Sequence, residues 1–280
     1  MATNNRIFYA VQSVAVCKTG FPPTAGASAN VAFLKGVQSV GITTNFTLEQ
    51  AFELGQVEIY ENSEDIADVE VTIEKLIDGE KLIYLSAVGN DGKTNVVSAS
   101  AKQCDVYLAI YADTNTSTSG QTPEKVVNCS GMYVSSISYT YPVDGNATES
   151  VTLVGNDKFW SDNVAGVIAD PKTSYGSPAT GTDGSDVPVS GIIRRNNTLP
   201  AEVTTQGPAD SRHLQNISIS ADFGRENILE LGRFGPYYKY ATFPFEVTSE
   251  FEVIATSGDL VSVSGNAENL TDRTIVIKDQ

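Results

Sequence analysis

The chain has 280 residues, of which 41% are hydrophobic and 19% charged, and its formal net charge is −16. The hydrophobic content excludes wholesale disorder, and the length is sufficient for two domains with separate cores. The excess of acidic residues argues against a protein that binds nucleic acid, because affinity for phosphate comes from Lys and Arg. No apolar run is long enough to cross a bilayer and no signal-peptide pattern is visible, so we expect a soluble chain made in a cytoplasm, without a membrane partner.

Two strands and a short helix are expected in the first part of the chain. Residues 7–16 and 31–44 alternate apolar and polar side chains, as half-buried strands do. Thr47 then resembles a helix N-cap, with Gln50 completing a capping box and Gly55 as the stop. This pattern predicts a helix of about two turns.

An acidic stretch begins within this predicted helix. Between Glu49 and Glu80 there are eleven carboxylates against one base, Lys75. Such a run is typical of a solvated face that keeps a protein soluble. It also suits a surface that is held near DNA and must not adhere to it, and the sequence leaves both interpretations open.

More strands are predicted beyond the acidic stretch. Residues 69–76 and 105–112 have strand patterns, and the first of these alternates as an antiparallel strand with one wet face does. Residues 132–141 and 149–154 flank a turn that contains Pro142-Val143-Asp144-Gly145-Asn146, so they are expected to form a hairpin.

The region around residues 38–56 occurs twice. Residues 215–233 repeat it 177 positions later, with seven of nineteen residues identical. The match resumes where residues 245–254 repeat the strand over 69–76, and again where residues 272–279 resemble 105–113. A fixed long period indicates one structural unit used twice. Because Gly224 stands where the first copy has Thr47, the second helix is expected to be shorter or more irregular.

The second copy has no counterpart of the hairpin over 132–154. A strand at the end of an incomplete sheet exposes unpaired backbone groups, which invite pairing with another chain. We therefore predict a first β-domain over 1–160, a linker or loop over 161–207 and a second, shortened β-domain over 208–280.

The linker is rich in Gly, Ser, Thr, Pro and Asp. It contains Arg194-Arg195, which could contact the carboxylates of a neighbouring subunit or could be solvated. Tyr237, Tyr238 and Tyr240 follow the second repeat motif. Tyrosines in this pattern can stack on bases, but few cations accompany them, which favours packing at a subunit interface or under a loop. The two arginines and three tyrosines are thus candidates for a subunit interface.

No catalytic or metal-binding pattern is apparent. The chain has one histidine, His213, and lacks a nucleophile elbow, a Walker loop and a dinucleotide fingerprint. Cys17, Cys104 and Cys129 match no zinc spacing and are expected to be buried thiols, with a pairing of the last two left open. We expect no enzyme, no metal site and no cofactor.

The repeated motif resembles tail-tube proteins of tailed bacteriophages. The resemblance rests on residues 37–46, on Phe52-Glu53-Leu54-Gly55 with the acidic turn after it, and on residues 131–139 with 144–149. It covers both copies, although the chain is about twice the size of a single tube domain. The resemblance implies an all-β fold with one short helix per repeat, in two tandem antiparallel β-sandwich or half-barrel domains.

The same resemblance implies a virion structural protein, made in the host cytoplasm, whose copies form stacked rings of a tail tube. Its partners would be other copies of itself, sheath, baseplate and neck proteins, and DNA that passes without specific binding. An acidic lumen would repel the DNA phosphates. The acids expected to face the lumen or the ring-to-ring contact are Glu58, Glu61, Glu64, Asp65, Asp68, Glu70, Glu74 and Asp78.

Three chains would make a pseudo-hexameric ring if both copies line the lumen, and six would be needed if only one does. Two other classes stay open. One is a different virion part, such as a head decoration, neck or baseplate protein. The other is a glycan- or calcium-binding β-module, with the three tyrosines as a platform for sugar or with Asp183 and Asp186 as sources of oxygen ligands.

Overall fold

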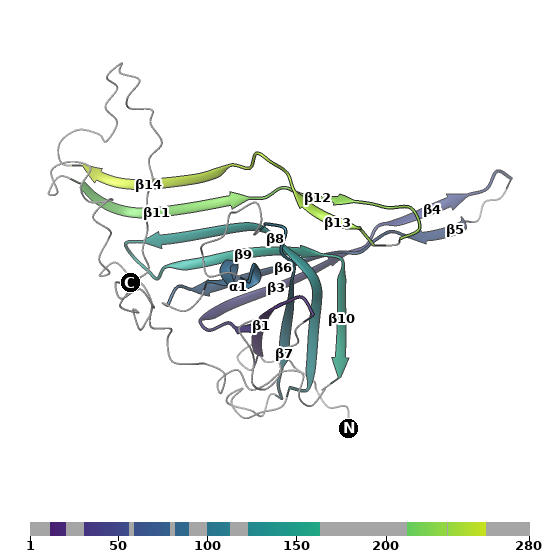
Figure 1. Ribbon diagram of the computed structural model, residues 1–280, viewed down its shortest axis with the longest axis horizontal. Coiled ribbons are helices and arrows are strands. Elements are labelled where there is room, and N and C mark those ends of the chain that lie inside the picture. The colour runs from purple at the N-terminus through teal and green to yellow at the C-terminus, as the bar shows by residue number, and fades with distance from the viewer. Residues whose placement is uncertain are drawn as a thin grey trace, which may run out of the picture.

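The computed structural model describes residues 12–20, 31–55, 59–78, 82–89, 100–112, 123–162, 212–233 and 235–255. This part of the chain forms fourteen strands and one short helix, and ten of the strands join in one antiparallel sheet that curls into a half-barrel (Figure 1). The elements in chain order are β1 (Gln12–Lys18), β2 (Val31–Phe33), β3 (Val37–Asn45), β4 (Leu48–Phe52), β5 (Ile59–Glu64), β6 (Asp68–Leu76), α1 (Ile83–Ala87), β7 (Cys104–Ile110), β8 (Lys125–Pro142), β9 (Thr148–Gly155), β10 (Asp157–Asp162), β11 (Arg212–Asp222), β12 (Arg225–Ile228), β13 (Tyr238–Ala241) and β14 (Val247–Ala255). No helix in the described ranges is long and apolar enough to span a bilayer.

The long strand β8 belongs to two arms of the sheet. Its first half pairs with β7 and β10, which gives a short arm in the order β2-β1-β7-β8-β10. Its second half pairs with β9 and β11, which gives a long arm in the order β3-β6-β9-β8-β11-β14. Gly131 lies between the halves with φ of 63°, a conformation that glycine adopts without steric cost. Asp105 accepts the N–H of Gly131 at 2.9 Å and the hydroxyl of Ser130 at 3.0 Å, which holds the joint in place.

The hydrophobic core lies between the two arms. Val14 and Val106 of the short arm cluster with Val71 and Leu153 of the long arm, together with Ile83 of α1, and all five are buried. Because successive residues of a strand point to opposite faces, one face of the long arm is committed to this core. The other face of the long arm is free to carry a different chemistry.

The cysteines are buried thiols, as expected. Cys17, Cys104 and Cys129 are free. Cys104 and Cys129 lie on the paired strands β7 and β8, but Cys129 stands opposite Val106 and Cys104 opposite Met132. Burial raises the pKa of Cys17 to about 12 and that of Cys129 to about 11, so neither is a reactive thiolate.

Most of the predicted strands are confirmed. The segments over 69–76, 105–112 and 245–254 correspond to β6, β7 and β14, and the predicted hairpin corresponds to β8 and β9. The predicted strand over 31–44 is instead two strands, because the chain turns at Gly36, whose φ is 70°. Of the predicted strand over 7–16, residues 12–16 lie in β1 and the rest lie outside the described residues.

The predicted helix after Thr47 is wrong. Residues 48–52 form β4, which pairs with β5 from Leu48 opposite Glu64 to Phe52 opposite Ile59. The second copy behaves in the same way, since β12 pairs with β13 where an irregular helical turn was expected. In both places the apolar residues of the pattern are exposed, so no core holds a helical face, and cross-strand pairing decides the conformation. The helix in the described chain is α1, outside either predicted helix.

Strands of the two similar sequence segments belong to one half-barrel sheet, and a tandem duplication into two domains stays a prediction. β11, from the second copy, pairs with β8, from the first, along Asn216–Asp222. The division into domains over 1–160, 161–207 and 208–280 stays a prediction. Of the predicted linker, residues 161 and 162 lie in β10, and residues 163–207 lie outside the described residues, as does the expected strand over 272–279.

Candidate functional site

The face of the long arm that points away from the core is made of small polar and acidic residues. One row of register partners crosses all six strands and reads Ser39, Glu74, Ser150, Ser138, Ser220 and Thr248. The next row reads Gly41, Thr72, Thr152, Ser136 and Asp222. We call this surface the polar face; it also contains Thr43, Asn45, Asp68, Glu70, Thr148, Thr140, Asn216, Ser218, Glu250 and Glu252, with Leu76 and Val154 near its ends.

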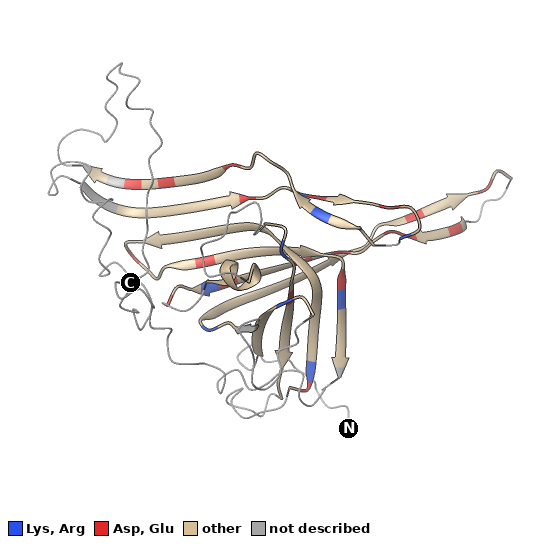
Figure 2. Cartoon of the chain, in the orientation of Figure 1, with Lys and Arg blue, Asp and Glu red and all other residues tan. Residues whose placement is uncertain are grey.

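The charge of the polar face has one sign. Its acids lie mainly on β6 (Glu70, Glu74) and β14 (Glu250, Glu252), on either side of a central zone of Ser and Thr, and none of its positions is Lys or Arg. Figure 2 shows the acids on β14 and on the hairpin β4–β5. The one base of β6, Lys75, is buried on the opposite side of the strand. A surface of this kind repels polyanions and offers them no cation to bind.

The polar face is bounded by two open sheet edges. Within the described residues β3 pairs only with β6, and β14 pairs only with β11. On β14, Val247 and Ile254 are more than half exposed. Unpaired edge strands are a template for pairing with another chain, unless bulges, prolines or covering elements block them.

Two hairpins leave the same end of the long arm (Figure 1). The hairpin β4–β5 is exposed along its whole length, and its apolar side chains include Phe52, Leu54 and Tyr60. The hairpin β12–β13 belongs to the similar sequence segment, in which Arg225–Ile228 aligns with residues 48–51. Leu54 and Leu231, which are 177 positions apart, are both fully exposed. Exposed apolar groups on a projecting element make the two hairpins candidate contact surfaces.

The structure separates the predicted acids into groups. Glu61, Glu64 and Asp65 belong to the β4–β5 hairpin, and all three are exposed. Asp68, Glu70 and Glu74 lie on the polar face, with Asp68 4.0 Å from the Nζ atom of Lys239. Asp78 instead pairs with Lys75 at 3.3 Å, and Glu58 lies outside the described residues.

The three predicted tyrosines do not form one platform. Tyr238 packs edge-on against Tyr133, with ring centroids 5.8 Å apart. Tyr240 is on β13 two residues away, and its hydroxyl donates to Glu226, while Tyr237 is exposed and lies under the guanidinium of Arg233. Tyr237 and Tyr238 contribute to a cavity of about 230 Å³ that Gln103, Asn156 and Lys239 also line. Their place at a subunit interface stays a prediction, and Arg194 and Arg195 lie outside the described residues.

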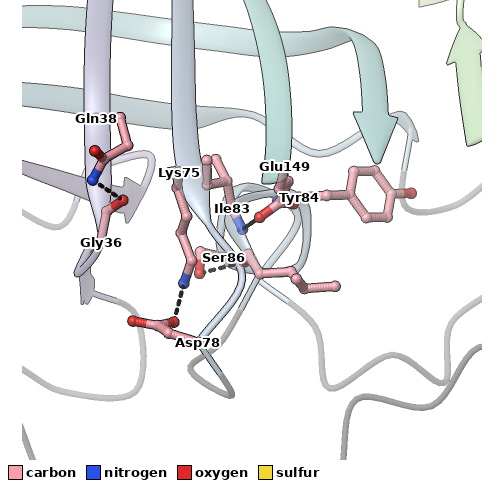
Figure 3. Close-up of polar contacts among 9 residues, drawn as sticks. Gly36, Gln38, Lys75, Asp78, Ile83, Tyr84, Ser86 and Glu149 are labelled. Carbon is pink, nitrogen blue, oxygen red and sulfur yellow. Dashed lines mark hydrogen bonds and ion pairs between the residues drawn. The ribbon is translucent and has the colours of Figure 1, made fainter. Parts of the chain in front are cut away.

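A buried polar cluster supports the long arm from the core side (Figure 3). The Glu149 carboxylate accepts the backbone N–H groups of Ile83 at 2.8 Å and Tyr84 at 3.1 Å, and the hydroxyl of Tyr139 at 3.2 Å. Glu149 is fully buried and stands opposite Lys75 in the β6–β9 register. The cluster fixes the start of α1 to β9.

Sequence reasoning missed this cluster, although a signal was present. In β9 the alternation puts Glu149 on the same side as Val151 and Leu153, and in β6 it puts Lys75 on the same side as Val71 and Ile73. A charged residue at an inward position of each of two strands is the pattern of a buried ion pair.

The stability of the protein should depend on pH through Glu149. Burial raises the pKa of this carboxyl above its ordinary value, while its backbone hydrogen bonds and Lys75 oppose the shift. The folded state therefore binds the proton more tightly than the unfolded state does. The contribution of this group to stability is complete below about pH 4.3 and declines as the pH rises through the folded pKa.

We expect the free energy of unfolding of the wild type, minus that of Glu149→Gln, to fall as the pH rises from about 4. Urea denaturation of both proteins over a pH series measures this difference. A difference that is constant or rises with pH would contradict the assignment.

No known protein-family pattern matches the sequence, and no curated protein matches it. Solved structures give distant matches. A chain in the cryo-EM structure of the cap that terminates the anti-feeding prophage tube is 12% identical at a TM-score of 0.40, covering 58% of this chain and 95% of that chain. A chain in the extended sheath-tube complex of an extracellular contractile injection system is 14% identical at a TM-score of 0.38, covering 57% and 95%. A chain in the virion of a gene transfer agent particle is 8% identical at a TM-score of 0.31, covering 53% and 95%.

Proposed function

We propose that this chain is a structural subunit of a phage-type tail tube, in which copies form rings and the rings stack into a conduit for the genome. The observation that carries the proposal is the polar face, which is acidic, has no base and lies between two open edges of one sheet. The role is mechanical rather than catalytic. Formed in the host cytoplasm, the tube would be part of the virion.

The geometry of the long arm suits ring closure. Its six strands alternate in direction, so β14 of one copy runs antiparallel to β3 of the next when copies are placed head to tail. Glu250 and Glu252 of β14 would then face β3, whose polar-face residues carry no charge, so no like charges oppose each other across the joint. Closing the sheet in this way leaves no open edge.

The polar face would line the lumen. Glu70 and Glu74 of each copy would point at the passing DNA, and their repulsion of phosphates would allow it to slide without adhering. Because strands of both repeats share this face, the arrangement favours three chains per ring over six. Sheath, baseplate and neck proteins would then contact the outside and the ends of the tube.

The two hairpins would make the ring-to-ring contacts. Both project from the same end of the long arm (Figure 1). Both expose apolar side chains, and the acids of β5 lie there too. Negative-stain electron microscopy of the concentrated protein tests the whole proposal. Hollow rods of uniform width with a regular axial repeat are expected, and monomers would overturn it.

A second candidate is another virion part built on the same plan, such as a cap, neck or baseplate ring. The open edges and the polar face would serve a single ring equally well. Electron microscopy distinguishes the two candidates, because such a part gives closed, finite rings at every concentration.

We expect the double variant Leu54→Asp/Leu231→Asp to form rings that do not stack. Both side chains are fully exposed, so the folded chain tolerates aspartate there, whereas a carboxylate buried in an apolar ring-to-ring contact is strongly unfavourable. Electron microscopy should show rod length collapsing to single rings.

The matched control is Val143→Asp/Phe159→Asp, which changes two exposed apolar residues that belong to neither hairpin. The control should form rods as the wild type does. Rods of normal length from the Leu54→Asp/Leu231→Asp variant would exclude the hairpins as the stacking elements.

A further inference from the structure

Phe46 and Phe223 hold the same position in the two repeats but have opposite environments. Each follows the last residue of its strand, β3 or β11, and the two are 177 positions apart. Phe223 is 2% exposed, whereas Phe46 is 69% exposed. The difference arises from what lies beside each strand.

Phe223 contacts the other repeat through both its backbone and its ring. Its backbone N–H donates to the carbonyl of Ser135 at 2.8 Å, and its ring stacks on Tyr84, with centroids 6.3 Å apart and planes 8° apart. Ser135 on β8 and Tyr84 on α1 both belong to the first repeat. Phe223 is therefore an anchor that seats β11 of the second repeat on the first.

Part of the environment of Phe223 comes from its own repeat. Its ring lies 5.1 Å from that of Phe245. The registers, with Thr44 opposite Val69 and Ala221 opposite Val247, put Ala67 of the first repeat at the position of Phe245. The first repeat therefore has a smaller side chain at this position than the second. Two things differ between the sites: Ala67 stands where the second repeat has Phe245, and the edge of β3 has no second strand partner within the described residues.

We infer that Phe46, with Leu48, anchors a second copy of this chain on the edge of β3, as Phe223 anchors the second repeat on the first. The second copy contributes the β14 side of its long arm. This inference rests on the proposed ring and names the side chains that hold its joint.

Two features identify a second copy as the occupant. The edge of β11 that corresponds to the open edge of β3 is already covered, and what covers it is a repeat of the same chain. In addition, β3 carries no charge on its polar face, so it can accept the glutamates of β14 without like-charge repulsion.

The residue two positions after each anchor fits this interpretation. In the second repeat it is Arg225, whose Nε donates to the carbonyl of Val134 at 2.8 Å and whose guanidinium lies over the Phe223 ring at 5.8 Å. In the first repeat it is Leu48, which is exposed. A leucine adds apolar area to a contact between copies without the cost of burying a charge.

The test compares Phe46→Ala with the matched variant Phe223→Ala, using sedimentation for association and urea denaturation of the dissociated chain for stability. Phe46→Ala should weaken association by about 30-fold or more, as loss of a central aromatic anchor does, with an unchanged urea midpoint. Phe223→Ala should lower the urea midpoint, because it removes a buried ring within the chain. Phe46→Leu should associate with intermediate strength.

Three results would overturn the inference. Association of Phe46→Ala at wild-type strength would show that rings form without this anchor, and the proposed function would stand. If Phe46→Ala lowers the urea midpoint as much as Phe223→Ala does, the side chains that pack on Phe46 belong to its own chain. A wild-type protein that stays monomeric would overturn both the anchor and the ring.

Discussion

Replacing Glu149 by alanine should lower the free energy of unfolding by about 3–5 kcal/mol, the range found when one partner of a buried polar pair is removed. The substitution leaves the N–H groups of Ile83 and Tyr84 and the hydroxyl of Tyr139 without their acceptor. It also removes the charge opposite Lys75, whose ammonium lies 3.3 Å from Asp78. Urea denaturation at neutral pH measures the loss.

Two further variants separate this cause from a general effect of losing a carboxylate. Glu149→Gln retains one acceptor oxygen and should cost about 1–3 kcal/mol. Glu70→Ala, on the exposed face of β6, should change the free energy of unfolding by no more than about 0.5 kcal/mol. A loss below about 1 kcal/mol for Glu149→Ala would mean that the hydrogen bonds at the start of α1 contribute little.

The strands of the sheet were predictable where the local sequence pattern matches the pattern of burial. In β6 polar residues alternate with Val69, Val71 and Ile73, and these three apolar side chains are buried. The turn at Asp144 and Gly145 likewise marks the hairpin β8–β9. In both cases the pattern and the tertiary packing agree.

The hairpin β4–β5 was not predictable by the same reasoning. Thr47, Gln50 and Gly55 form a locally consistent helix signal, but a segment this short is not stable as a helix without a core to bury its apolar face. The partner strand β5 begins only at Ile59, so the competing pairing does not show in the local pattern. The order of strands in the long arm is equally invisible, because β11 lies 70 or more residues after the part of β8 with which it pairs.

The candidate site was predictable in its chemistry but not in its layout. The acidic stretch was identified as one group, yet strand alternation places Glu70 and Glu74 on the polar face, while Glu61 and Glu64 lie on a projecting hairpin. The serine and threonine rows of the polar face come from strands of both repeats and appear only when the register is known. The repeated sequence did single out two strands that contribute to the polar face, β3 and β11.

The double variant Glu70→Lys/Glu250→Lys should make assembled tubes bind DNA, whereas tubes of the wild type should not bind it. Both acids lie on the polar face, on strands toward opposite edges of the long arm, and every copy in a ring would repeat the new lysines. Non-specific binding with a Kd of about 10⁻⁴ to 10⁻⁶ M is expected near physiological salt, and it should weaken steeply as salt rises. Cosedimentation of assembled tubes with short duplex DNA measures this binding.

The control must carry the same change of net charge at another place. Glu124→Lys/Asp144→Lys meets this condition, because both acids are exposed and lie outside the polar face. If the polar face lines a lumen, only the first variant places its lysines where several copies converge around one duplex, and their contacts with phosphate then add. Equal retention of DNA by both variants would show that net charge alone decides, and would remove the reason to place the polar face around the genome.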